Sequence, residues 1–429
     1  MGIFSIFGNK KKEEEEAKDL EQVKLEQKER AAEEARKAHQ DMPWPVIGRI
    51  NPINIKDAEE GMIEETVSAD RKDEIGAMIY EEDIDPEFIK ALNGQELIFL
   101  LTALEAFNKK APLPGFEKNH RLIYNEVLHR VRNAEYLYVL YDQTVGFPFV
   151  EQGYANVYFE KELADKAAEI FNKQFRKLAV RKCQIEDPNY KGGGKFGFFD
   201  YLYYIGIENL ILDNGAYRVR FKKSEIVAAP GEWGGAESKP EPVNSALNFA
   251  MIDFLEEVRW PVKYEKRDQI LKAKEMRMLS LIRGAQFLVP TQHEGPTETD
   301  ENGRIRIGKD TKLKFMVLKT PDDKQFLPIY SDPFEFAKQG MTKDWNGGMF
   351  RYQDIIRFIQ DREGIVINPL GENVVLTKDR IMALEVAGKQ AEAMRAKNQA
   401  GKAAAASAND AVSAAVSQAM KEMRKEDNQ

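Results

Sequence analysis

A chain of 429 residues is long enough for two or three domains of about 100–200 residues each. Its hydrophobic content of 43% suffices for packed cores, whereas 31% charged residues indicate that part of the chain is solvated. With 63 basic and 71 acidic side chains the net charge is −8, which excludes a strong overall attraction for nucleic acid.

The cysteine content and the lengths of the apolar runs also indicate the cellular compartment. The single cysteine, Cys183, excludes an internal disulfide framework and a thiolate zinc cluster, and it fits a reducing compartment. No run approaches the roughly 20 apolar residues of a membrane helix, and residues 1–8 lack the order of a signal peptide. We therefore expect a cytoplasmic protein. A weak contact with an anionic inner-membrane surface stays open as an alternative, through Ile3, Phe4, Ile6 and Phe7.

Residues 1–41 predict a charged, exposed N-terminal helix. Acid–base pairs lie one helical turn apart with the acid first, namely Glu14/Lys18, Glu26/Arg30 and Glu33/Lys37. Prolines 43 and 45 should end this helix. Residues 42–90 are expected to be an irregular linker, and Asp85-Pro86 marks the start of the next helix.

The middle of the chain repeats itself. Four segments recur in the same order, and the last pair aligns without a gap: Tyr136–Leu140 with Phe287–Pro290, Asn156–Leu163 with Pro328–Glu335, Phe199–Ile205 with Tyr352–Ile359, and Glu208–Phe221 with Glu363–Leu376. Shared order over this length favours duplication of one module. The copies would span residues 91–230 and 243–385, joined by a flexible linker over 231–242.

Within each copy the patterns predict short strands that run into helices. Asp213-Asn-Gly215 and Asn368-Pro-Leu-Gly371 are typical turn sequences between two strands. Ser331 is expected to cap a helix that has Pro333 just inside it. Residues 386–429 form an alanine-rich tail, either helical or disordered. The fold class is therefore α+β (mixed α/β), with two tandem copies of a small mixed-sheet module with packed helices.

The second copy resembles the N-terminal domain of the SseB family, the bacterial "enhanced serine sensitivity" proteins. The resemblance lies in Phe287–Pro290, Phe326–Pro333 and Gly364–Asn373, within roughly residues 265 to 385. It implies a small α/β fold and supplies no catalytic residues. The first copy departs from the family pattern at three positions, where it has Leu140, Phe159 and Asn214, so it is interpreted as a degenerate copy.

Cys183 is the first candidate for chemistry. Arg181 and Lys182 flank it, but the following residues lack the glycines of an anion-binding loop, so an ordinary strand cysteine is favoured. The histidines are scattered along the chain without ligand or triad spacing: His39, His120, His129 and His293. We interpret them as structural or surface residues.

Three further motifs resemble functional sites but are interpreted as turns or core. Lys191-Gly-Gly-Gly-Lys195 lacks the spacing of a phosphate-binding loop and predicts a flexible turn. Asp300–Arg304 lacks the final glutamate of a calcium loop and predicts a hairpin turn. The aromatic face from Phe198 to Ile205 has helical spacing and predicts core. We therefore assign no catalytic, cofactor-binding or metal-binding residues.

Two functions fit this organisation. The first is a non-enzymatic protein-interaction or regulatory module, in which two linked domains strengthen weak contacts with a protein partner of unknown identity. Differences between the copies support it, because Trp345–Gly348 has no equivalent in the first copy. The alternative is a small-molecule metabolic enzyme or ligand-binding protein, with a site between the two modules.

Overall fold

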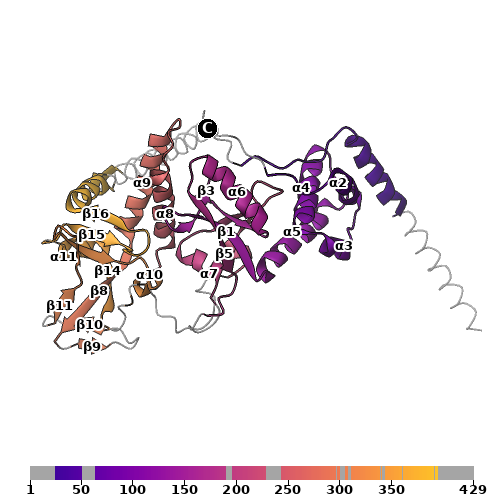
Figure 1. The fold of residues 1–429 in the computed structure, drawn as a ribbon. Helices are drawn as coiled ribbons and strands as arrows, with labels where there is room; N and C mark the ends of the chain where they lie inside the picture. Colours follow the sequence, from indigo (N-terminus) through magenta and orange to yellow (C-terminus); the bar gives the residue numbers. More distant parts are fainter. Residues whose placement is uncertain are drawn as a thin grey trace, which may run out of the picture. The chain divides into compact units, whose positions relative to one another are not determined.

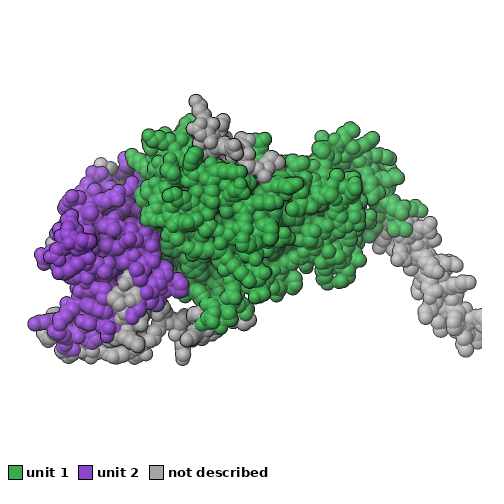
Figure 2. All heavy atoms as spheres, in the orientation of Figure 1, with its two compact units in different colours: residues 1–274 green, residues 275–429 purple. Residues whose placement is uncertain are grey.

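The structure, a computed structural model, describes residues 25–50, 63–189, 196–228, 243–295, 297–299, 305–307, 311–338, 340, 344–359, 361–390 and 392–394. The chain divides into two compact units, residues 1–274 (unit 1) and 275–429 (unit 2), coloured separately in Figure 2. Helices and several small mixed sheets are present, so the expected α+β class is confirmed. None of the helices in these ranges is long and apolar enough to cross a membrane.

Unit 1 opens with helices. They are a helix over residues 25–38, α2 (Ala69–Gly76), the 3₁₀ turn η1 (Ala77–Tyr80), α3 (Pro86–Ala91), α4 (Gly94–Lys110) and α5 (Phe116–Asn133). The helix start at Asp85-Pro86 is confirmed, because the Asp85 side chain accepts the Glu87 N–H. Residues 42–90 are not irregular throughout as expected, since α2, η1 and most of α3 lie there. Ile75, Ile79 and Ile89 are buried, so packing supplies the stability that such short helices lack alone.

A seven-stranded sheet follows in unit 1 (Figure 1). Its strands are β1 (Tyr136–Asp142), β2 (Phe147–Pro148), β3 (Val150–Glu151), β4 (Tyr154–Tyr158), β5 (Leu178–Gln184), β6 (Asn209–Leu212) and β7 (Val219–Lys222). The helices among and after them are α6 (Lys161–Lys173), α7 (Phe198–Tyr204), the 3₁₀ turn η2 (Lys223–Glu225), α8 (Ser245–Arg259) and α9 (Arg267–Gly284). Helix α6 packs on β1, β4 and β5, where Leu140, Tyr158 and Phe171 form a buried core.

Unit 2 contains a second set of strands. They are β8 (Gln286–Glu294), β9 (Thr297–Thr299), β10 (Ile305–Ile307), β11 (Lys312–Phe315), β12 (Leu318–Lys319), β13 (Gln325–Ile329), β14 (Asn346–Arg351), β15 (Gly364–Ile367) and β16 (Val374–Thr377). Two short helices, α10 (Pro333–Ala337) and α11 (Tyr352–Phe358), lie between strands, and a further helix covers residues 378–390.

Strand pairing follows the same directions within each unit. In unit 1, β1 is antiparallel to β5 and β4, β4 is parallel to β6, and β6 is antiparallel to β7. In unit 2, β8 is antiparallel to β14, a bridge joins it to the end of β13, β13 is parallel to β15, and β15 is antiparallel to β16. The orders are therefore β5-β1-β4-β6-β7 and β14-β8-β13-β15-β16. Even the register agrees, because Tyr138 pairs with Tyr158 as Leu288 pairs with Tyr330.

Two expectations need correction. The cap of α10 is Asp332, whose side chain accepts the Glu335 N–H, whereas Ser331 uses its hydroxyl elsewhere; Pro333 is the first helical residue as expected. The expected module boundary at residue 243 also differs from the unit boundary, which falls inside α9 after Lys274. Helix α8 belongs to unit 1, where the Glu256 carboxylate accepts the N–H of Val150 on β3. The expected linker over 231–242, residues 1–24 and residues 395–429 lie outside the described residues.

Candidate functional site

Cys183 lies on β5, opposite Leu137 on β1. Burial raises the pKa of its thiol to about 11, although Tyr141 and Arg181 act in the opposite direction. The thiol therefore stays protonated at neutral pH, which makes it a poor nucleophile. This environment is the one expected for an ordinary strand cysteine.

The histidines are dispersed over the two units. His39 follows the first helix, His120 and His129 lie on α5, and His293 lies on β8. His39 is buried with its Nε2 3.0 Å from the Phe107 carbonyl, and the Nε2 of His120 lies 2.8 Å from a Glu105 carboxylate oxygen. Within the described ranges, no group of three or more His, Cys, Asp or Glu side chains is placed to hold a metal ion.

The structure describes only some of the remaining sequence motifs. Lys191–Lys195 and Asp300–Arg304 lie outside the described residues, although β9 and β10, on either side of the latter, form the expected antiparallel hairpin. On α7, Phe198, Phe199 and Leu202 are buried, whereas Tyr201 and Tyr204 are half-buried, so the core interpretation is confirmed for part of this aromatic face.

In unit 2 two of the three segments that carry the family resemblance meet around one side chain, Asn368. Its Nδ2 donates to Ser331 Oγ and to Glu372 Oε2, each over 2.8 Å, and its Oδ1 accepts the Ser331 N–H over 2.9 Å. Asp332 and Glu335 adjoin this group, and we call the five residues the Asn368 cluster: Ser331, Asp332, Glu335, Asn368 and Glu372. All five are buried. The end of β13 is thereby bonded to the end of β15.

Two carboxylates of the Asn368 cluster are incompletely paired. Glu335 Oε2 and Glu372 Oε1 are buried and have no hydrogen-bond partner among the described residues, while Lys338 pairs with the other oxygen of Glu335. Burial, and then repulsion by Glu335, raise the pKa of Glu372 to about 8. Gly371 permits this crowding, because a Cβ there would lie 2.4 Å from Glu335 Oε2. The cluster can hold a proton at neutral pH.

The corresponding turn of unit 1 is built around Asp213. Its Oδ1 accepts the Phe159 N–H over 3.1 Å, as Asn368 accepts that of Ser331, and burial raises the pKa of Asp213 to about 7. Helix α4 completes this turn through Gln95. The Gln95 Nε2 donates to Asp213 Oδ2 over 2.9 Å, and its Oε1 accepts the Tyr217 N–H over 3.0 Å.

A segment from the start of unit 1 covers this turn. We call residues 44–50 and 63–67 the N-terminal strap. The Tyr217 hydroxyl donates to the Pro45 carbonyl over 2.7 Å and also bonds Glu65. Ile50 and Ile63 close over Gly215, where the Cδ1 atoms would lie 2.4 and 2.9 Å from an added Cβ. Sequence reasoning missed the strap, since its residues carry no periodic pattern.

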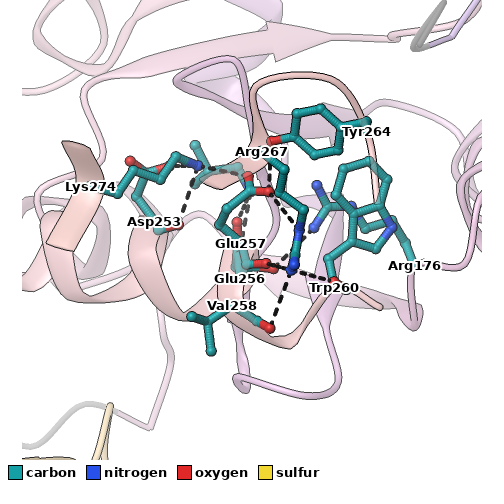
Figure 3. Close-up of polar contacts among 10 residues, drawn as sticks. Arg176, Asp253, Glu256, Glu257, Val258, Trp260, Tyr264, Arg267 and Lys274 are labelled. Atoms are coloured by element: carbon teal, nitrogen blue, oxygen red, sulfur yellow. Dashed lines mark hydrogen bonds and ion pairs between the residues drawn. The ribbon is translucent and has the colours of Figure 1, made fainter. Parts of the chain in front are cut away.

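A second charged cluster in unit 1 fixes helix α8 to the sheet, and Figure 3 shows its side chains. The Glu256 carboxylate accepts the Val150 N–H over 3.1 Å, and Arg176 donates to the Glu256 carbonyl while lying 3.8 Å from the centre of the Trp260 ring. Lys274 lies 2.9 Å from Asp253 and 3.2 Å from Glu257. Burial raises the pKa of Glu256 well above its ordinary value. These contacts link helices and strand, so we interpret the cluster as architectural.

An open groove also lies on unit 1, between α5 and the chain that enters α3. Its volume is about 660 Å³, and Ile84, Pro86 and Leu122 supply its apolar lining. Charged side chains and Asn125 line the rest, and Lys118 is ion-paired with Asp83.

Comparison with known proteins agrees with part of this picture. No curated protein and no solved structure matches the chain. Residues 268–383 match the family model described as the SseB protein N-terminal domain. The matched range contains both halves of the Asn368 cluster and every strand of unit 2. The resemblance expected for the second copy is thus confirmed over residues 268–383.

Proposed function

We propose that the chain is a non-enzymatic interaction protein built from two copies of one module, the first a degenerate relative of the SseB-type domain. The matched strand orders support the duplication, since each unit repeats the same antiparallel and parallel pairings. Turn geometry supports it as well. Asp213 and Asn368 both have a left-handed backbone and both accept the N–H that begins the segment after the neighbouring strand.

One observation carries the functional part of the proposal: the family-like motif residues are used to hold strand ends together. The side-chain amide of Asn368 donates to Ser331 and Glu372, and all three residues are buried. A catalytic group must reach substrate, whereas these groups reach one another. A rigid scaffold that presents its turns and surface strands suits recognition of another protein, and two linked copies would strengthen weak contacts.

The same proposal places the protein in the bacterial cytoplasm, in keeping with its free, protonated Cys183.

The test is a tagged pull-down from the native host, using the full chain and a chain without residues 1–41, followed by reconstitution with purified components. We expect one near-stoichiometric protein that binds the purified full chain saturably in calorimetry. Loss of that protein on truncation would place its contact in the N-terminal helix.

The proposal fails if no protein binds the purified chain while a metabolite raises its melting temperature and is consumed. That outcome would favour the small-molecule enzyme instead.

A further inference from the structure

The last described helix of unit 2 is apolar on two opposite sides. It covers residues 378–390, and residues 392–394 are also helical. Ile381 and Leu384 are buried on its inner side. The other side, by helical spacing, carries a second set of apolar residues, all of them exposed. We call this set the outer stripe: Met382, Ala383, Val386, Ala387, Ala393 and Met394.

The large side chains of the outer stripe are more than half exposed. The exposed fractions are 59% for Met382, 57% for Val386 and 69% for Met394. The solvent side of a surface helix normally carries polar residues, and a helix that is apolar on all sides is normally buried. Met276 on α9 is 61% exposed as well, and its neighbour Glu275 is ion-paired with this helix. An apolar surface of this kind fits a covered position.

We infer that the outer stripe is the docking site of residues 411–423 of the same chain, which pack on it as an amphipathic helix. The inference goes beyond the proposed function, because it depends neither on the duplication nor on an external partner.

The sequence of residues 411–423 matches the stripe in chemistry. Its larger apolar residues recur at helical spacing, at Val412, Val416, Met420 and Met423. Residues 411–420 contain no charged side chain, so docking buries no charge against the stripe. An isolated helix of this length is marginal in water and gains its stability from packing of its apolar side. Methionines on both surfaces suit such packing, since their flexible side chains fill irregular gaps.

Chain connectivity favours this segment over a second copy. Roughly 16 residues, 395–410, join Met394 to the segment, and extended they reach about 50 Å. Val386 lies only about 12 Å before Met394 along the helix. The connection is therefore long enough to fold back, and Gly401 within it suits the required turn. A segment tethered in this way has an effective concentration in the millimolar range.

Hydrogen exchange of the purified full chain, measured by mass spectrometry over residues 409–424, tests the docking. We expect protected amides in the wild type. Val386→Asp should speed their exchange by at least about tenfold, because a carboxylate replaces an apolar contact more than 20 positions away. The matched control is Leu370→Asp, which we expect to change this exchange by no more than about twofold. Leu370 is 61% exposed and lies at the other end of β16 from this helix.

A change within the segment tests the same contact from the other side. Val416→Asp should uncover the stripe and raise the fluorescence of the dye 1-anilinonaphthalene-8-sulfonate. Gln418→Asp, on the opposite side of the segment's helix, should leave the fluorescence near the wild-type value. Exchange over residues 325–329 in β13 should match the wild type in every variant, which shows that unit 2 remains folded.

Three results would overturn the inference. Exchange over residues 409–424 could be as fast as in an unfolded chain. It could instead be slow but equal in the wild type and the Val386→Asp variant, which would mean that the segment folds without the stripe. Analytical ultracentrifugation gives the third: a dimer that dissociates in the Val386→Asp variant would make a second copy the occupant.

Discussion

Asp213 and Asn368 occupy the same place in their respective sheets. Each has a left-handed backbone, with φ of 54° and 47°, and each donates its N–H to the neighbouring parallel strand over 2.9 Å, at Val157 and Ile329. Aspartate and asparagine tolerate this conformation better than other residues with a side chain. The same turn is therefore held by an acid in unit 1 and by an amide in unit 2.

Replacing Asn368 with alanine should destabilise unit 2 by about 3 kcal/mol, because Ser331 and Glu372 lose buried hydrogen bonds. Hydrogen exchange measured by mass spectrometry over residues 364–377 reports this locally. Asn373→Ala is the control, since Asn373 is exposed but shares the left-handed backbone with φ 53°. It should cost only about 1 kcal/mol, and equal losses would show that backbone strain alone explains the effect.

The stability of unit 2 should fall as the pH rises toward 8. Folding raises the pKa of Glu372 from 4.5 to about 8, so the folded state holds this proton more tightly than the unfolded chain. The stabilisation is complete below pH 4.5 and is lost as the pH rises through about 8. Glu372→Gln should flatten this slope and be the more stable protein at alkaline pH. Urea unfolding between pH 5 and 9 measures it, with exposed Glu363→Gln as control. Parallel slopes for wild type and Glu372→Gln would contradict the assignment.

Gln95→Ala should loosen the Asp213 turn of unit 1. The change leaves Asp213 Oδ2 and the Tyr217 N–H without their α4 partner in a buried place, at a cost of about 2–3 kcal/mol. Thr102→Ala on the same helix removes only a bond to the Ile98 carbonyl and should cost less than about 1 kcal/mol. Thermal unfolding with exchange data over residues 209–222 compares the two. A Gln95→Ala protein as stable as the Thr102→Ala protein would rule out this role.

Arg176→Ala should release helix α8 from the sheet of unit 1. The guanidinium both stacks on Trp260 and donates to the Glu256 carbonyl, so its loss exposes a buried indole. We expect faster proteolysis and faster hydrogen exchange over residues 245–259. Lys173→Ala, an exposed change nearby in the sequence, should leave both unaltered. Unchanged exchange in the Arg176→Ala protein would mean that the other contacts of α8 suffice.

The sequence predicted the structure correctly wherever a local pattern of residues determines the conformation. The hairpins around residues 213–218 and 368–373 form as their turn residues predict, and Pro333 starts α10. Local patterns failed where tertiary contacts decide. Helices α2 and η1 are too short to form by propensity and exist because their isoleucines are buried. Ser331 was favoured as a cap, but Asn368, 37 residues away, accepts its N–H and bonds its hydroxyl.

The candidate site was the least predictable part. Asn368 and Ser331 stood out only as pieces of a family resemblance, and nothing local shows that their side chains meet. The pKa of Glu372 is raised first by burial and then by Glu335, which lies on another element. The strap could not be predicted because its contacts are not local: Ile50 packs on a turn that follows it by more than 160 residues.

The N-terminal strap also constrains how unit 1 is made on the ribosome. The hydroxyl of Tyr217 bonds a carbonyl 172 positions earlier in the chain, at Pro45. At a synthesis rate of about 5–20 residues per second, the turn that buries Ile50 and Ile63 is synthesised on the order of 10 to 30 seconds after them. During that interval two apolar side chains of the nascent chain are without their final neighbours, so the strap completes its packing only after the turn at Gly215 has been synthesised.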